Sequence, residues 1–203
     1  MTGLAGWLLA GLGLGVVVVR GRSVAVALVT AQALVLAAWA MAQAGQGSDI
    51  VVALALAGRA VALGALFLIA ARRSREPRPV RARFGPAVRA GLAVALILVL
   101  AGLVPQFGLT SPAAQRAVLA LIALGLTCAA TRRATLFQIL AIIMMENGLA
   151  LAALAARHPS SLVIELGVTL DLTLIAAVAA MFHLRIFNEL GAGDSTVLRS
   201  LRD

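Results

Sequence analysis

The chain has 203 residues, of which 62% are hydrophobic and only 12% are charged. A soluble domain carries about 25% charged residues and has too little interior to hold so much apolar surface. This composition excludes a soluble enzyme, a disordered tail and a secreted domain held together by disulfides. The 17 basic residues are all arginines and outnumber the 8 acidic residues, which gives a net charge of +9. The composition therefore predicts a basic integral membrane protein.

Seven segments are long and apolar enough for membrane helices, each of which needs about 20 mostly apolar residues. They cover Thr2–Val19, Ser23–Met41, Ile50–Ala71, Ala87–Val104, Ala113–Ala130, Ala134–Ala156 and Ser161–Phe182. The first segment has no basic leader and continues into Arg20 and Arg22, so we interpret it as a retained span rather than a signal peptide. The sequence thus predicts an all-α integral membrane bundle of seven transmembrane helices.

The arginines between these spans alternate from one connection to the next. The first, third and fifth connections and the C-terminal tail hold 14 of the 17 arginines, whereas the second and fourth connections hold none. Arginine in short loops marks the cytoplasmic side of a membrane protein, and this signal outweighs the alternative that the loops bind anionic lipid headgroups. We therefore expect the N-terminus outside and the C-terminus inside.

The third connection, from Arg72 to Arg89, is the longest linker of the chain. It carries seven arginines, and its three prolines exclude one continuous helix. We expect the linker to divide the chain into two parts. Residues 1–86 would hold three spans and the Arg/Pro-rich cytoplasmic loop, and residues 87–203 would hold four spans and a short cytoplasmic tail.

Three ionisable residues lie close to the middle of predicted spans, where a charge costs about 2.5–3.5 kcal/mol on insertion scales, and Glu165 also lies within a span. Arg59 is central in the third span, Glu146 in the sixth and Asp171 in the seventh, while Glu165 lies nearer the outer end of the seventh. Such residues face a protein interior or water. A carboxyl group in these surroundings can exchange protons, which predicts a proton relay through Glu146, Asp171 and Glu165.

A purely structural role is the alternative for these charges. Arg59 would then neutralise Glu146 or Asp171, or contact another subunit, and lock helices together. Glu165 and Asp171 are six residues apart and therefore point about 120° away from each other, which argues against a shared-proton dyad. Gln138 precedes Glu146 by eight residues and is expected roughly on the same helix face.

Recognisable catalytic and metal-binding motifs are absent from the sequence. His158, His183 and the single cysteine, Cys128, are far apart and form no ligand cluster. The chain has no phosphate loop, nucleophile elbow or dinucleotide fingerprint, and its arginines do not suit a nucleic-acid face. We therefore expect no catalytic residue, cofactor or metal, no nucleic-acid partner, and no enzymatic activity of the chain by itself.

Three segments of the second half resemble one protein family. Arg132–Leu151, with its Glu-Asn-Gly step, resembles a signature of hydrogenase-4 component E, a membrane subunit of formate hydrogenlyase and related group 4 nickel–iron hydrogenase complexes. Glu165–Asp171 resembles the last span of that family, and Arg185–Arg202 resembles its short cytoplasmic ending. The motifs cover about residues 131–203, whereas the first half matches in hydropathy alone.

The resemblance implies a non-catalytic subunit of a proton-translocating redox complex in a bacterial or archaeal cytoplasmic membrane. Its partners would be antiporter-like and hydrogenase or complex I-like subunits. The last three helices of the family are similar to the K subunit of bacterial complex I, which makes residues 113–182 the K-like part of this chain. In that subunit a membrane-embedded Glu belongs to a chain of ionisable groups, and Glu146 occupies the matching position. Asp171 is the nearest equivalent of the K subunit's second Glu.

Two alternatives to this function stay open. In the first alternative the chain is a purely structural subunit of a membrane arm. In the second it is the K-like subunit of a multi-subunit cation/proton antiporter. The four additional spans and the C-terminal tail favour the hydrogenase-type family.

Overall fold

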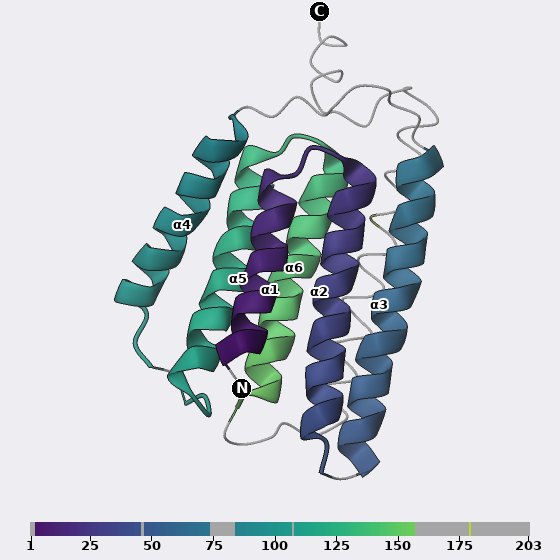
Figure 1. Cartoon of the computed structure of the whole chain (residues 1–203), viewed down its shortest axis with the longest axis vertical. Helices are drawn as coiled ribbons and strands as arrows, with labels where there is room; N and C mark the ends of the chain where they lie inside the picture. The colour runs from purple at the N-terminus through teal and green to yellow at the C-terminus, as the bar shows by residue number, and fades with distance from the viewer. Residues whose placement is uncertain (1–2, 46, 74–83, 107, 157–178, 180–203) are drawn as a thin grey trace, which may run out of the picture.

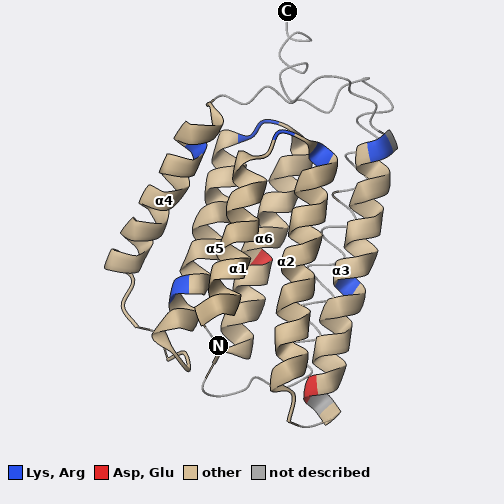
Figure 2. Cartoon of the chain, viewed as in Figure 1, with Lys and Arg blue, Asp and Glu red and all other residues tan. Residues whose placement is uncertain are grey.

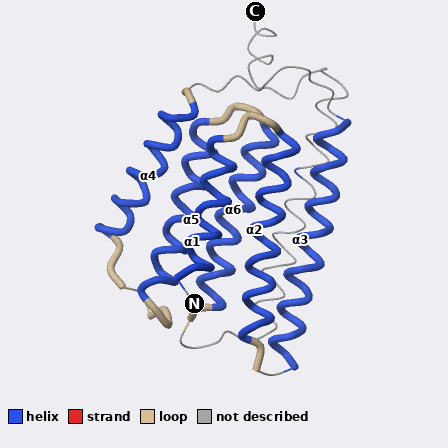
Figure 3. The backbone as a smooth tube through the Cα atoms, viewed as in Figure 1, coloured by secondary structure: helices blue, strands red, loops and turns tan. Residues whose placement is uncertain are grey.

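A computed structural model describes residues 3–45, 47–73, 84–106, 108–156 and 179 of the chain. Within these residues the chain forms six α-helices and no strand (Figure 3). The helices are α1 (Gly3–Val18), α2 (Arg22–Gln43), α3 (Gly47–Arg73), α4 (Pro86–Leu103), α5 (Pro112–Thr131) and α6 (Thr135–Leu154). Of these described helices, α2 to α6 have the length and composition to cross a membrane, while α1 is apolar but shorter, with 16 residues. The all-α fold class is confirmed for this part of the chain.

The first six predicted spans coincide with the six described helices, and their ends differ by at most three residues. The seventh predicted span, Ser161–Phe182, lies outside the described residues except for Ala179, and so do Glu165 and Asp171. The count of seven spans therefore stays a prediction.

Prolines and caps define the starts of two helices. Pro86 opens α4 and Pro112 opens α5, at positions where the missing N–H of proline costs no helical hydrogen bond. The Ser111 hydroxyl caps α5 by accepting a hydrogen bond of 3.2 Å from the Ala114 amide. These local signals set the helix boundaries, while the apolar sequence between them sets helix length.

The helices run alternately in opposite directions along the long axis of the bundle (Figure 1). α1 packs against α2, α4 and α5, and α6 packs against α5 and α2. α3 lies at one edge on α2, and α4 lies at the opposite edge. The largest cluster of buried apolar residues joins α1, α2, α5 and α6 with the inner faces of α3 and α4. Polar side chains placed on this inner surface must therefore find partners within the bundle.

Two glycines allow the closest helix contacts. A Cβ atom at Gly125 of α5 would collide with the Met145 side chain of α6 and lie 2.8 Å from the Ala141 carbonyl oxygen. A Cβ at Gly64 of α3 would lie 2.6 Å from the Thr30 hydroxyl of α2. Small residues at such crossings let backbones approach, as is typical of helices packed in lipid.

Most of the arginines in the described part of the chain gather at one end of the bundle (Figure 2). The α1–α2 loop, the end of α3, the start of α4 and the α5–α6 loop all meet there. These segments carry Arg20, Arg22, Arg72, Arg73, Arg89, Arg132 and Arg133. We refer to this end as the arginine-rich end; among described residues the opposite end carries Arg116 and Asp49. The described parts of the first, third and fifth connections, which the charge pattern assigns to one side of the membrane, are thus together in space.

Candidate functional site

Arg59 of α3 and Glu146 of α6 form an ion pair inside the bundle, between guanidinium Nη1 and carboxylate Oε1. The two side chains are 7% and 5% exposed, and each lies near the middle of its helix. Among the described helices α3 packs mainly on α2, and the ion pair adds a polar link from α3 to α6 beside the apolar cluster that they share. Each charge in this position requires a neutralising partner, and the pair supplies one to both.

A second polar contact adjoins the ion pair. The Asn147 side-chain amide donates to the Gln32 side-chain oxygen at 3.1 Å, and the Gln32 amide donates to the Leu9 carbonyl at 2.9 Å. Both side chains are buried, and they connect α6 through α2 to α1. We call Gln32, Arg59, Glu146 and Asn147 the polar belt, because together they cross the bundle through α2, α3 and α6 at mid-depth.

The shape of α1 makes room for this belt. A Cβ atom at Gly13 of α1 would lie 3.0 Å from the Gln32 side-chain nitrogen and 3.2 Å from the Met144 methyl carbon. Any side chain at this position would press on the glutamine amide. Gly13 therefore lets α1 approach the point where the Asn147–Gln32 hydrogen bond joins α6 to α2.

The structure brings some of the residues predicted from the sequence together and separates others. Arg59 meets Glu146, one of the two carboxylates that the sequence offers as its partner. Gln138 is exposed while Glu146 is buried, so the expectation that they share a face is wrong. Eight residues on a helix leave an offset of about 80°, which turns Gln138 out of the bundle. The positions of Glu165 and Asp171 relative to Glu146 lie outside the described residues.

Sequence reasoning missed Gln32 as a member of the belt. Gln32 is an uncharged side chain near the middle of an otherwise apolar span, so it adds no charge that would draw attention to it. An amide that must satisfy four hydrogen-bonding positions in a dry interior is nevertheless a signal for a partner on another helix. A search for lone amides inside predicted spans would have found it.

Arg89 and Arg132 bind the C-terminal end of α1 at the arginine-rich end. Arg89 donates to the carbonyls of Val17 at 2.6 Å and Val18 at 3.2 Å. Arg132 donates to the Val17 carbonyl at 3.1 Å and also to the Val19 carbonyl. The last carbonyls of a helix have no partner within the helix and carry partial negative charge, so two guanidinium groups satisfy and stabilise them.

These two arginines are more than orientation signals. Both are almost completely buried, and the Arg132 guanidinium carbon also lies 4.2 Å from the centre of the Phe137 ring. Burial and the neighbouring Arg89 lower the pKa of Arg132 to about 10, which leaves the side chain protonated at neutral pH. Arg89 and Arg132 therefore anchor α1 to α4 and to the α5–α6 loop.

The chemistry that the belt offers is proton binding and hydrogen bonding. Glu146 is the one described carboxylate away from the helix ends, and Asp49 lies in the first turn of α3. Among the described residues no group of three His, Cys, Asp or Glu is arranged to hold a metal ion. Cys128 is buried, and its thiol contacts the Phe137 carbonyl at 3.6 Å.

The chain is similar to hydrogenase-4 component E of Escherichia coli K12, Escherichia coli O157:H7 and Shigella flexneri, with 33% identity over 139 residues in each case. The match covers 66% of this chain and 63% of each relative, so it spans less than two thirds of the relatives' length. No family model matches the chain, and no solved structure matches it. The chain is therefore a homologue of hydrogenase-4 component E, which supports the family that Arg132–Leu151 resembles.

Proposed function

We propose that the protein is a non-catalytic, multi-pass membrane subunit of a proton-translocating redox complex, of the group 4 hydrogenase or complex I type. Its relationship to hydrogenase-4 component E supports membership of a hydrogenase complex. The buried Arg59–Glu146 pair carries the functional part of the proposal, because ionisable residues inside a membrane are costly and are found mainly at functional sites, proton relays among them. Glu146 takes up and releases protons inside the membrane.

The proposal includes the full topology. Seven spans cross a bacterial or archaeal cytoplasmic membrane, with the N-terminus outside and the C-terminus inside. The arginine-rich end faces the cytoplasm, in keeping with the gathering of basic loops there. Residues 1–86 and 87–203 form the two parts of the chain, and residues 113–182 correspond to the K-like part. The partners are antiporter-like and hydrogenase or complex I-like subunits, which pack against the exposed apolar faces.

Proton transfer through the subunit begins and ends at carboxylates. A proton that reaches Glu146 neutralises the carboxylate and weakens its attraction to Arg59. We propose Asp171 and Glu165 as the further proton carriers of the relay. The apolar helices around Glu146 exclude bulk water, so a proton leaves only toward a polar neighbour.

Replacement of Glu146 by Gln in the complete complex tests this function. The variant keeps the size and hydrogen-bonding capacity of the side chain but removes its titratable proton. We expect normal copurification of the other subunits, normal electron transfer and loss of the proton gradient that a pH-sensitive dye reports in membrane vesicles. Arg116→Gln, which removes an exposed arginine at the opposite end, is the matched control and should pump normally. Unchanged pumping in Glu146→Gln contradicts the relay.

A purely structural subunit is the second candidate, and the same ion pair favours it because the pair joins α3 to α6. Loss of assembly in Glu146→Gln, rather than loss of pumping alone, would identify this role. A K-like subunit of a cation/proton antiporter is distinguished by its copurifying partners, which would then include no hydrogenase subunit.

A further inference from the structure

The surroundings of Glu146 make Arg59 its one opposite charge among the described residues. The helices packed around α6 carry their other ionisable groups far from the middle of the bundle. These groups are Arg22 on α2, Asp49, Arg72 and Arg73 on α3, and Arg116 and Cys128 on α5. α1 has no ionisable side chain. Within this part of the chain, Arg59 is therefore the one opposite charge that acts directly on the buried Glu146 carboxylate.

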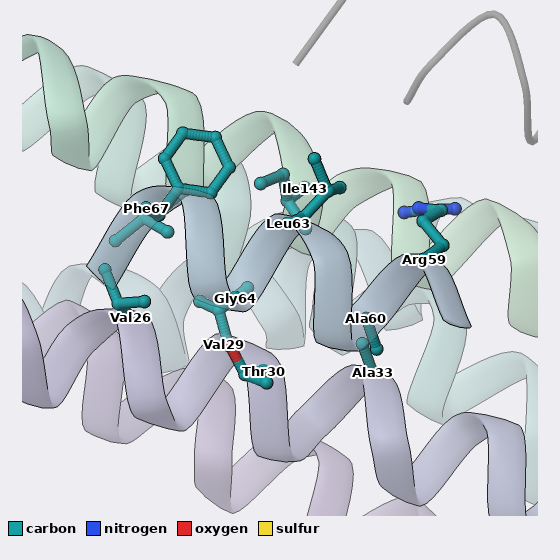
Figure 4. Close-up of a pocket in the computed structure, with 11 residues that line it drawn as sticks. Val26, Val29, Thr30, Ala33, Arg59, Ala60, Leu63, Gly64, Phe67 and Ile143 are labelled. Carbon is teal, nitrogen blue, oxygen red and sulfur yellow. The ribbon is translucent and has the colours of Figure 1, made fainter. Parts of the chain in front are cut away.

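A small cavity lies against Arg59, between α2, α3 and α6 (Figure 4). Its volume is about 20 Å³, and a cavity of about 10–15 Å³ is enough for one water molecule. Arg59 and Thr30 are its polar lining residues, and the others are aliphatic or aromatic. The cavity therefore has room for one water molecule in a lining whose polar groups are Arg59 and Thr30. The cavity thus leaves open space beside the Arg59 side chain, in addition to its contact with Glu146.

The energetics argue against packing as the sole purpose of the ion pair. Desolvation of two charges offsets most of their attraction, so apolar side chains of similar volume often stabilise a fold equally well. Removal of one partner, in contrast, leaves the other charge buried and uncompensated. The ion pair therefore contributes little to the packing of the helices. Its effect on the charge of the carboxylate, in contrast, is large.

We propose that Arg59 is the positioning residue that sets the charge of Glu146, and that protonation of Glu146 releases the guanidinium toward a water in the cavity beside Thr30. In the resting state the ion pair keeps Glu146 ionised. When a proton binds, an O–H bond forms on the carboxylate, Arg59 keeps its own proton, and one of its N–H groups turns to the cavity. Release of the proton restores the pair. This inference rests on the proposed function in that Glu146 exchanges protons.

Infrared titration of the full chain in lipid nanodiscs tests the role of Arg59. The carboxyl band of protonated Glu146 is identified by its loss in Glu146→Gln and then followed with pH in Arg59→Gln, Arg59→Lys and the control Arg116→Gln. An opposite charge within about 4–6 Å changes the proton affinity of a carboxyl group by about 10- to 1000-fold. We expect Arg59→Gln to bind the proton at least about tenfold more tightly than the original chain, Arg59→Lys to shift less, and Arg116→Gln to titrate unchanged. Identical titrations in all four proteins would overturn the proposal.

A variant at the cavity keeps the test decisive if Arg59→Gln does not fold. Thr30→Val preserves the shape of the side chain but removes the hydroxyl, and it leaves both members of the ion pair in place. Without the hydroxyl, the water that we propose beside Thr30 no longer stabilises the state in which Glu146 is protonated. We therefore expect Thr30→Val to bind the proton at Glu146 more weakly than the original chain. An unchanged titration in Thr30→Val, together with an unchanged one in Arg59→Lys, would refute the switch.

The outcomes separate this inference from the proposed function. In one outcome the carboxyl band of Glu146 shifts in the Arg59 variants although the complex translocates no protons. This result supports control of Glu146 by Arg59 and contradicts the proton relay. A complex that loses translocation in Glu146→Gln, but whose carboxyl band ignores Arg59, supports the relay and overturns the role of Arg59.

Discussion

The Asn147 side-chain amide of α6 donates a 3.1 Å hydrogen bond to the Gln32 side-chain oxygen of α2 in the apolar interior of the bundle. Gln32 in turn donates to the Leu9 carbonyl of α1. This relationship holds the face of α6 that carries Asn147 against α2, and so directs the adjacent Glu146 toward Arg59 on α3. The ion pair and the amide pair thus depend on one rotation of α6.

Replacement of Gln32 by Leu should lower the stability of the bundle. The change leaves the Asn147 amide without a partner, and interhelical hydrogen bonds in membranes contribute on average about 0.6 kcal/mol, with a maximum of about 1.7 kcal/mol. We expect a loss of about 1 kcal/mol in the free energy of unfolding measured by denaturant titration in detergent. Gln138→Leu, at an exposed position of α6, is the control and should be nearly neutral.

A double-mutant cycle of Gln32→Leu and Asn147→Leu isolates the contact itself. If the amide pair is stabilising, the double variant should lose less stability than the two single variants together, because neither amide then remains buried alone. Strictly additive losses would show that the two side chains do not interact.

Replacement of Arg132 should detach the C-terminal end of α1 from the α5–α6 loop. Arg132→Ala removes two hydrogen bonds to the terminal carbonyls of α1, and hydrogen bonds to charged groups contribute about 1.5–3 kcal/mol. We expect a lower thermal unfolding temperature and faster proteolysis in the α1–α2 loop. Arg133→Ala removes an equal charge from the neighbouring exposed position and should change neither quantity. Equal effects of the two variants would indicate a general charge effect rather than anchoring of α1.

A methyl group at Gly125 should separate α5 from α6. In Gly125→Ala the new Cβ collides with the Met145 side chain and approaches the Ala141 carbonyl, so the helices must move apart. Overpacking of a well-packed interior costs about 1–3 kcal/mol, which exceeds the gain of about 1 kcal/mol in helix propensity from glycine to alanine. Thermal unfolding of the purified chain measures the difference. Gly11→Ala, where a Cβ meets no atom within 4 Å, should instead be neutral or stabilising.

The limits of the helices were the most predictable feature of the fold, and the contacts between helices were the least predictable. Hydropathy records whether about 20 residues suit a membrane, so the limits of α1 to α6 follow closely from composition and from prolines such as Pro86 and Pro112. Hydropathy contains no information on how each helix is rotated. Arg59 therefore had two possible carboxylate partners in the sequence, and Gln138 was assigned to the wrong face.

Arg89 and Arg132 illustrate a second limit of sequence reasoning. Arginine at a helix end serves equally as a topology signal in lipid headgroups and as a partner for helix carbonyls, and the same residue type at the same position satisfies both. Only the fold shows that these two side chains turn inward to α1 while Arg133 stays exposed. Residues of equal charge in one loop can thus have different roles.

The proposed orientation predicts which loops chemical reagents reach from each side of the membrane. Cys128, the single cysteine, is buried, and its replacement by Ala gives a background without thiols. In that background Gly45→Cys, in the α2–α3 loop, should react with a membrane-impermeant maleimide added outside intact cells. Arg133→Cys, in the α5–α6 loop, should react only after the membrane is permeabilised, because the arginine-rich end faces the cytoplasm. Labelling of the two positions in the reverse order would invert the topology and place the basic loops outside.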